Sequence, residues 1–270
     1  MLPIPHDYHL HTEFSIDSDT PMEDQCRRAI ELGIPEICIT EHADFVHIDE
    51  GVNYYDPVGF MHEIERCREL FEDQLRLKAG VEIGEWHRFP GQAATLADQH
   101  PYDFIIGSLH WVDDQLVLDP SYFTGRDERD AYERYFSELL LMVQHGGFDV
   151  IGHLDCPKRA GFDVYGGFHT EQFEGSMREV LRAAIERGIG IELNTGTARR
   201  RIGRFSPELE VLRWYREMGG EIITVGSDAH TTKSLGYRFD DAREMLDAAG
   251  FTAVTCFDLR QPYFEDLDDE

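Results

Sequence analysis

Seven short apolar runs alternate with helix-like stretches along this chain, and that alternation is the strongest constraint on its fold. The runs are rich in Ile, Val and Leu, as strands buried on both faces of a parallel sheet usually are. The predicted strands are Asp7–Thr12, Glu36–Thr40, Leu77–Ile83, Phe104–Leu109, Val150–Leu154, Ile189–Leu193 and Ile222–Val225.

Helical patterns separate these runs. Pro21 suits the first turn of a helix that ends at Gly33, and Pro207 suits the first turn of one that ends at Gly219. A third stretch, 127–145, carries large apolar residues on one helical face: Tyr132, Tyr135, Phe136, Leu139, Leu140 and Val143.

Repeated alternation of strand and helix within 270 residues favours one parallel sheet closed into a barrel. An open doubly wound sheet is the alternative. No GxGxxG segment follows the first predicted strand, which argues against a dinucleotide-binding fold. We therefore expect an α/β protein built as a β/α barrel.

The charge balance limits the possible partners. The chain has 53 acidic and 25 basic residues, for a net charge of −28. Such a field repels nucleic acid and anionic membranes, so we expect neither as a partner. Two explanations for the charge stay open, a highly soluble surface or adaptation to a salty cytoplasm. Five scattered cysteines and the lack of an apolar export signal lead us to expect a cytoplasmic protein with free thiols.

Polar residues stand at the carboxyl end of every predicted strand, where parallel β/α folds form their active sites. Their side chains are metal-ligand types or an amide. In strand order they are His9 and His11, Glu41 and His42, Glu82, His110, His153 and Asp155, Asn194, and Asp228 and His230.

The spacing of these residues indicates metal binding. Residues i and i+2 of a strand point to the same side, so His9 and His11 can hold one ion together, as can Asp228 and His230. Six imidazoles with carboxylates and no cysteine suit Zn, Fe or Mn. The ligands are too many for one ion, so we expect two or three. Glu41 is expected to support the site or to be solvated rather than to bind an ion.

Several motifs resemble those of the polymerase and histidinol phosphatase (PHP) superfamily, in the same order along the chain. They are DYHLHTEFSIDS, ITEHAD, GVEIGE, IIGSLH, IGHLD and VGSDAH. The segments IGSLHWV, GHLDCPKR and IELNTGTAR are most similar to the histidinol-phosphatase branch. The resemblance implies one domain over residues 1–270 with a distorted seven-stranded (β/α)7 barrel and a metal site at the carboxyl ends of the strands.

The resemblance also implies a ligand set for each ion. The ligands of the first ion would be His9, His11, Glu82 and Asp228. The second ion would share Glu82 as a bridge and add His110 and His153. The third would use Asp17, His42 and His230. Many family members carry histidine where Asp17 stands, and the third ion is expected to be labile.

The implied reaction is hydrolysis of a small phosphate monoester by a metal-activated hydroxide, with Glu82, Asp228 and Arg159 in the catalytic machinery. Arg159 and Arg199 are expected to bind the phosphate, because guanidinium groups pair with phosphate oxygens, and Asn194 is expected to contact the substrate. For Arg200, Arg201 and Arg204, phosphate contact and a solvated loop both stay open. Three acidic residues that follow His110 suggest recognition of a cationic substrate: Asp113, Asp114 and Asp119.

Three functions compete at this point. The first is dephosphorylation of L-histidinol phosphate in histidine biosynthesis. The second is a related phosphoesterase activity on nucleotides, cyclic phosphates or other small phosphates. The third is a non-enzymatic module bound to a polymerase, which the acidic charge of the chain disfavours.

Overall fold

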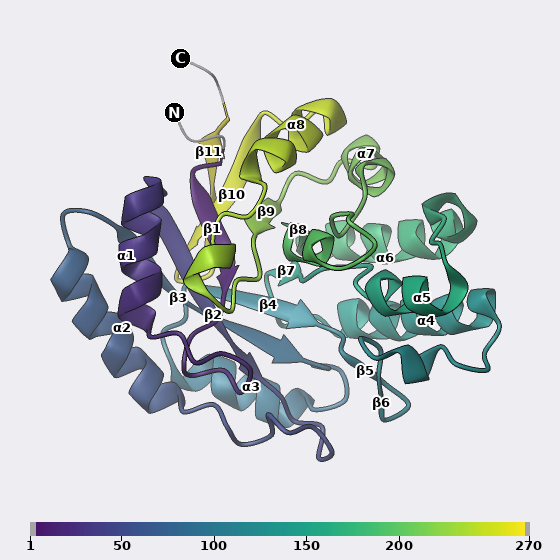
Figure 1. The fold of residues 1–270 in the computed structure, drawn as a ribbon, viewed down its shortest axis with the longest axis horizontal. Helices are drawn as coiled ribbons and strands as arrows, with labels where there is room; N and C mark the ends of the chain where they lie inside the picture. The colour runs from purple at the N-terminus through teal and green to yellow at the C-terminus, as the bar shows by residue number, and fades with distance from the viewer. Residues whose placement is uncertain (1–3, 268–270) are drawn as a thin grey trace.

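A seven-stranded parallel sheet forms the centre of the computed structural model, which describes residues 4–267 (Figure 1). Neighbouring strands follow the order β1-β2-β3-β4-β7-β8-β9, and every pairing is parallel. These strands are β1 (His6–Leu10), β2 (Glu36–Ala43), β3 (Arg76–Gly84), β4 (Phe104–Ser108), β7 (Val150–Ile151), β8 (Gly190–Asn194) and β9 (Ile223–Gly226).

The sheet curls into a nearly closed barrel. Its first and last strands meet through a single parallel bridge between Leu10 and Ala229, where the His11 backbone N–H donates to the Ala229 carbonyl oxygen at 2.9 Å. The predicted barrel is therefore confirmed, and the open doubly wound alternative is wrong because its edge strands would not meet. Closure by one bridge instead of a full ladder makes the barrel distorted.

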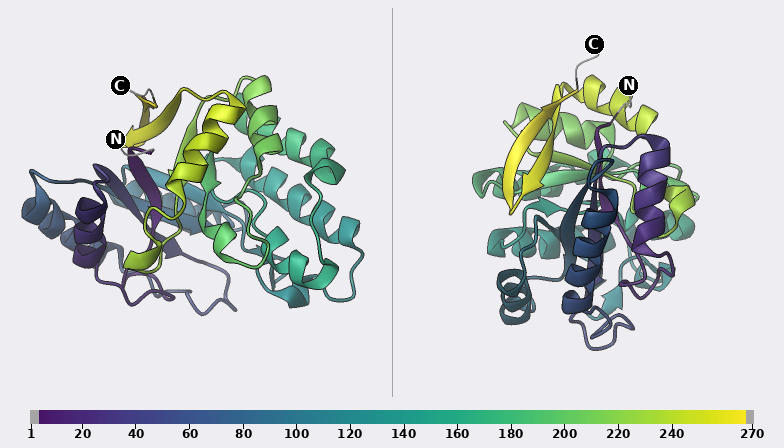
Figure 2. Two further views of the ribbon diagram at one scale, coloured as in Figure 1. Left: turned by 45° about the horizontal axis from the view of Figure 1, so that its top comes forward. Right: turned by 90° about the vertical axis from the view of Figure 1, so that its left-hand side faces the viewer.

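Helices cover the outside of the barrel (Figures 1 and 2). The α-helices are α1 (Met22–Leu32), α2 (Pro57–Phe71), α3 (Pro90–Gln99), α4 (Glu128–His145), α5 (Lys158–Tyr165), α6 (Glu174–Glu186), α7 (Leu209–Glu217) and α8 (Phe239–Ala249). Short 3-10 helices lie at Pro120–Tyr122, Thr170–Phe173, Gly196–Arg199 and Thr232–Ser234. Among residues 4–267, no helix is long and apolar enough to cross a membrane.

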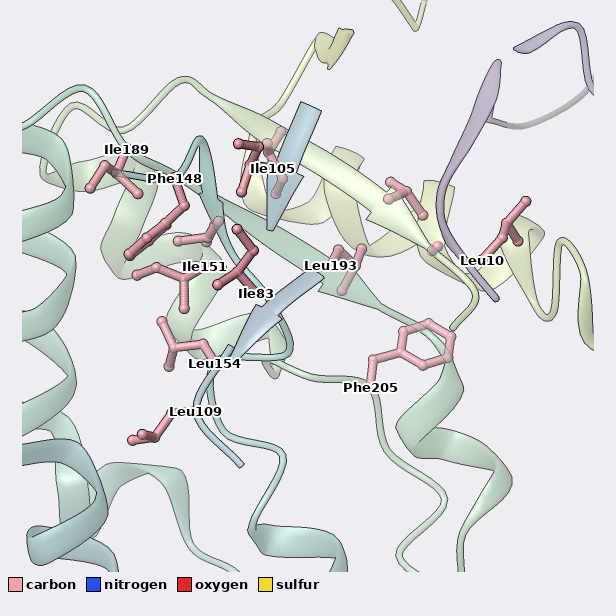
Figure 3. Packing of buried hydrophobic residues seen from close by; sticks show 14 of the residues in the cluster. Leu10, Ile83, Ile105, Leu109, Phe148, Ile151, Leu154, Ile189, Leu193 and Phe205 are labelled. Atoms are coloured by element: carbon pink, nitrogen blue, oxygen red, sulfur yellow. The ribbon is translucent and has the colours of Figure 1, made fainter. Parts of the chain in front are cut away.

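The main hydrophobic core lies between the sheet and these helices. Figure 3 shows part of it, with Ile83 of β3, Ile105 of β4, Ile151 of β7 and Leu193 of β8. All four side chains are completely buried. Because side chains alternate along a strand, the neighbouring residues of each strand point to the other face, toward the barrel interior.

A hairpin that the sequence analysis did not predict covers the amino-terminal end of the barrel. It consists of β10 (Ala253–Asp258) and β11 (Gln261–Asp266) and lies beside the start of β1 (Figure 2). The guanidinium of Arg260 pairs with Asp149, just before β7, at 2.9 Å. Because the hairpin covers the amino-terminal end of the barrel, a functional site is expected at the opposite end, where the strands have their carboxyl ends.

Most predicted strand ends differ from the structure by one to three residues, and two predicted boundaries differ for a clear physical reason. Pro207 does not open α7, which begins at Leu209, because the preceding Ser206 pairs with Asn194 in an isolated antiparallel bridge. Strand β7 ends at Ile151 rather than Leu154, because the chain turns sharply at His153, whose φ is +23°. By contrast, α1 and α4 end at the predicted glycines, Gly33 and Gly146.

Candidate metal centre

Glu82 of β3 lies in the middle of the predicted ligands. Its carboxylate is completely buried, and its Oε2 atom faces three histidines. Oε2 lies 3.3 Å from His9 Nε2 and 3.7 Å from His11 Nε2, both delivered by the end of β1. It also lies 2.9 Å from Nδ1 of His42, which belongs to β2. The sequence placed these residues up to 73 positions apart, and the barrel brings them together.

The other carboxylate oxygen of Glu82 faces two more histidines. Oε1 lies 3.5 Å from His110 Nε2 and 2.9 Å from His153 Nε2, and these two ring nitrogens are 3.4 Å apart. The Ser108 hydroxyl donates to the same oxygen at 2.5 Å. Glu82 is thus flanked by imidazole nitrogens on both oxygens, which is the arrangement expected of a carboxylate that bridges two cations.

The remaining predicted ligands extend this cluster toward solvent. Asp228 Oδ1 lies 3.6 Å from His11 Nε2 and 3.5 Å from His230 Nδ1. Asp17 Oδ2 lies 3.0 Å from His230 Nε2, and its Oδ1 lies 3.7 Å from His42 Nε2. The Asp17 side chain is 53% exposed, so this outer group is far more open than the groups around Glu82.

The donor atoms fit divalent metal ions. Four of them are buried and have no hydrogen-bond partner, namely Nε2 of His9 and His11, Nδ1 of His42 and Oε2 of Glu82. Buried polar atoms without partners are costly and rare in folded proteins. Two ligands of one tetrahedral ion with bonds of about 2.1 Å lie about 3.4 Å apart, and the separations around Glu82 are close to that value.

Among residues 4–267, three sets of donor atoms are compact enough to hold an ion, with every pair within 4.8 Å. They are His9, His11 and Asp228; His9, Glu82 and His153; and His11, His42 and His230. Because His9 and His11 each belong to two sets, the sets do not count the ions, and they group the ligands differently from the family-based assignment. In particular, His11 joins the outer group together with His42 and His230.

The electrostatics show that this pocket stabilises positive charge. Burial alone would raise the pKa of Glu82, but His9 and His42 outweigh it and hold that pKa well below its usual value. In return, Glu192 and Glu82 outweigh burial and raise the pKa of His9 well above its usual value. Metal ions can take the place of the imidazole protons in such a cluster, because ligand histidines bind in the neutral form.

Two hydrogen bonds orient the histidines of β1 for metal binding. His9 Nδ1 donates to Oε1 of Glu192 at 2.6 Å. His11 Nδ1 lies 3.0 Å from the Ser15 hydroxyl, which itself donates to Glu41 at 2.5 Å. Both rings are therefore held with the Nε2 lone pair directed at the cluster, as second hydrogen bonds of metal-binding histidines usually do. Glu41 supports the site without reaching the cluster.

Glu192 of β8 is the important residue that the sequence analysis missed. In addition to His9, it contacts His153, whose backbone N–H donates to Glu192 Oε2 at 2.7 Å. One carboxylate thus connects ligands on both sides of Glu82. The sequence does mark Glu192 as unusual, because it is a charged residue inside the otherwise apolar run of a buried strand.

Asn194 lies elsewhere than predicted. Its side chain is completely buried, and Nδ2 lies 3.3 Å from both oxygens of Glu192. Its Oδ1 accepts a hydrogen bond from the Thr197 backbone N–H at 3.2 Å. The amide therefore holds Glu192 and the following turn, and it does not line the cleft beside the cluster.

The predicted phosphate ligands line this cleft, which has a volume of about 670 Å³. Arg199 donates from Nη1 to the Ser227 carbonyl and from Nη2 to the Asp228 carbonyl, both at 2.6 Å. Since Asp228 has a φ of +53°, which is unfavourable for a residue other than glycine, these bonds stabilise a strained turn. Arg199 is thus partly committed to positioning Asp228.

Arg159 and Arg200 also line the cleft, and within residues 4–267 neither side chain forms a hydrogen bond or ion pair. The nearby Arg159 charge, burial and the Arg199 charge together lower the pKa of Arg200. Arg201 instead pairs with Asp163 at 2.7 Å, and Arg204 pairs with Glu208 at 3.2 Å. Uncompensated guanidinium groups beside a cationic cluster form an anion-binding wall.

The acidic residues that follow His110 do not face the cleft. Asp113 and Asp114 form the two-residue turn between the short strands β5 (Trp111–Val112) and β6 (Gln115–Leu116), and their carboxylates pair with Arg134 and Arg88. Asp119 accepts a hydrogen bond from the Ser121 backbone N–H at 2.8 Å. The suggestion that these three residues recognise a cationic substrate is therefore wrong.

Comparison with known proteins agrees with this geometry. A family model described as the PHP domain matches residues 7–196, which is most of the chain. The chain belongs to the PHP domain family. The family predicted from the motifs is thus confirmed, and so is the barrel that it implied.

Curated relatives of the chain are named as phosphatases. A histidinol-phosphatase of Lactococcus lactis is 30% identical over 256 residues, covering 93% of both chains. A probable histidinol-phosphatase of Clostridium acetobutylicum is 28% identical, covering 92% of this chain and 95% of the relative. The crystal structure of the histidinol phosphate phosphatase from L. lactis, complexed with zinc, L-histidinol and phosphate, matches with a TM-score of 0.87 and 26% identity, covering 96% of this chain and 98% of that one.

We predict that Glu82→Gln loses at least one bound ion and lowers kcat roughly a thousandfold, about 4 kcal/mol of barrier, because an amide bridges cations poorly. Elemental analysis and steady-state kinetics measure both effects. Glu36→Gln is the matched control, since Glu36 is equally buried but contacts Tyr8 and Arg76 at the other end of the barrel. Normal metal content and turnover in Glu82→Gln would contradict the bridging role.

We also predict that Glu192→Gln weakens metal binding about 10- to 100-fold, the usual effect of losing a hydrogen bond to a ligand histidine. His9 Nδ1 and the His153 backbone N–H face different oxygens of Glu192, so a glutamine would set its NH2 group against one of these two donors. Competition with a chromophoric chelator measures the affinity directly. An unchanged affinity in a folded variant would show that Glu192 does not position these ligands.

Proposed function

We propose that this protein hydrolyses L-histidinol phosphate to L-histidinol and inorganic phosphate. The protein is a metal-dependent phosphatase, and the observation that carries this conclusion is Glu82, which is flanked by imidazole nitrogens on both carboxylate oxygens. Histidines around it line a cleft together with Arg159 and Arg200, whose side chains have no ion pair among residues 4–267. The substrate itself is supported by the names of the curated relatives and by the ligands of the L. lactis structure.

We assign two to three divalent ions of Zn, Fe or Mn to the site. The first would be held by His9, His11, Glu82 and Asp228. The second would share Glu82 and add His110 and His153, and the third would use Asp17, His42 and His230. When bound, such ions make water acidic enough to ionise near neutral pH and offset the negative charge of the phosphoryl oxygens.

The protein residues bind and orient the phosphate. The guanidinium groups of Arg159 and Arg200 line the cleft and have no ion pair within the described residues 4–267, so they can donate to phosphoryl oxygens without breaking a contact seen there. Arg199 holds the backbone of Asp228 in place. Cys156 lies close in sequence to the predicted ligand His153. Its thiol is buried against Tyr135 and does not line the cleft, so it does not act as a nucleophile.

The proposed activity is tested by measuring phosphate release from L-histidinol phosphate and from a panel of nucleoside monophosphates and cyclic phosphates. We expect kcat/KM above about 10⁴ M⁻¹s⁻¹ for L-histidinol phosphate, within the usual range for an enzyme and its substrate. Activity should disappear on treatment with a chelator and return when Zn, Fe or Mn is added. A clear preference for a nucleotide would assign the related phosphoesterase activity instead.

Substitutions of the arginines should separate phosphate binding from positioning. Arg159→Ala and Arg200→Ala should each lower kcat/KM roughly 10- to 1000-fold, the effect of losing a charged hydrogen bond or two, with metal content unchanged. Arg199→Ala should also reduce the metal content, because the Asp228 turn loses two hydrogen bonds. Arg201→Ala, which removes an exposed ion pair outside the main cleft, is the control. Normal kinetics in Arg159→Ala and Arg200→Ala would exclude both from phosphate binding.

A further inference from the structure

Two carboxylates, Asp44 and Asp49, line the same cleft as the arginines but come from a different part of the barrel. Both follow β2, whereas Arg159 and Arg200 follow β7 and β8. In the sheet, β3 and β4 lie between these strands, and β3 carries Glu82. The cleft therefore has a basic wall, formed by the arginines, and an acidic wall, formed by Asp44 and Asp49. The metal cluster around Glu82 lies between the strands that carry these two walls.

Asp44 is buried without a hydrogen bond, and its one ion-pair partner among residues 4–267 is a distant histidine, His110. Asp44 is only 8% exposed, and within residues 4–267 neither of its oxygens accepts a hydrogen bond. The nearest basic group is His110 Nδ1, which lies 3.9 Å from Oδ1 and is too distant for a hydrogen bond. The carboxylate lies over Gly84, where a Cβ atom would come within 2.8 Å of Oδ1. A buried carboxylate in this state is costly unless a ligand compensates it.

Asp49 adds a second negative charge next to the first. Its Oδ1 accepts from the Gly51 backbone N–H at 2.7 Å, and its Oδ2 accepts from Trp111 Nε1 at 2.5 Å. These donors fix the carboxylate but leave its charge uncompensated, and within the described residues no lysine or arginine pairs with it. A Cβ atom at Gly51 would lie 3.1 Å from Asp44 Oδ2 and 3.2 Å from Asp49 Oδ1, so the two carboxylates flank one glycine.

We propose that Asp44 and Asp49 form a subsite that binds a positively charged group of the substrate, such as a primary ammonium, while the arginines and metal ions bind its phosphate. This inference rests on the proposed phosphatase function and narrows its substrate to phosphate esters that also carry a cation. Such a group supplies the hydrogen bonds that Asp44 lacks. A nucleotide, which brings further negative charge to this wall, is repelled.

The test compares two phosphate esters at about pH 7.5, where an imidazole is mostly neutral and an ammonium group supplies the positive charge. L-Histidinol phosphate carries the ammonium group, and 4-nitrophenyl phosphate carries no cation. In the metal-loaded protein, Asp44→Asn and Asp49→Asn should each lower kcat/KM for L-histidinol phosphate about 10- to 100-fold, mainly through KM. Neither should change kcat/KM for 4-nitrophenyl phosphate or the metal content. Asp114→Asn, which breaks a pair with Arg88 outside the cleft, is the control.

The other outcomes contradict the proposal in distinguishable ways. An equal fall for both esters with loss of metal in Asp44→Asn would mean that this residue only orients His110. Unchanged kinetics in Asp49→Asn would remove the subsite, and this variant decides the question if Asp44→Asn fails to fold, because no hydrogen bond or ion pair joins Asp49 to a histidine. Failure of the wild-type protein to hydrolyse either ester would instead refute the phosphatase function itself.

Discussion

The buried carboxylate of Glu82 is the constraint on which the site depends. Five imidazole nitrogens lie within 3.7 Å of its two oxygens, and they come from four different strands or strand ends. A negative charge in this position is tolerable only while positive charge surrounds it. The barrel provides that arrangement because parallel strands all end on the same face, so ligands that are distant in sequence become neighbours.

The residues around Glu82 fix the orientation of the side chains that the barrel brings together. Glu192 holds one ligand on each side of Glu82, and Asn194 in turn holds Glu192. Arg199 ties down the turn at Asp228, where the backbone adopts a left-handed conformation. The strain of such a turn persists only where neighbouring contacts enforce it. The predicted metal ligands are therefore held in place by a second set of polar contacts.

Much of the fold and of the side-chain cluster could be predicted from the sequence, because His9, His11, Glu82 and Asp228 stand at the ends of recognisable apolar strands. The sequence could not reveal Glu192, because a single charge within a strand does not show which residue it faces. It also could not separate Asp44 from Asp113, since both are acids near a predicted ligand. Only the tertiary contacts show that Asp113 pairs with an arginine, whereas Asp44 is buried without a hydrogen bond among residues 4–267. The β10–β11 hairpin was missed because it lies outside the strand–helix alternation.

We propose that Glu82 bridges two metal ions. This arrangement can be seen by anomalous diffraction from crystals of the metal-loaded protein, collected at the absorption edge of the bound metal. We expect two ions, one bonded to each carboxylate oxygen of Glu82 at about 2.0–2.2 Å, with His110 and His153 on one ion and His9 and His11 on the other. A single ion, or ions that do not contact Glu82, would contradict the proposal.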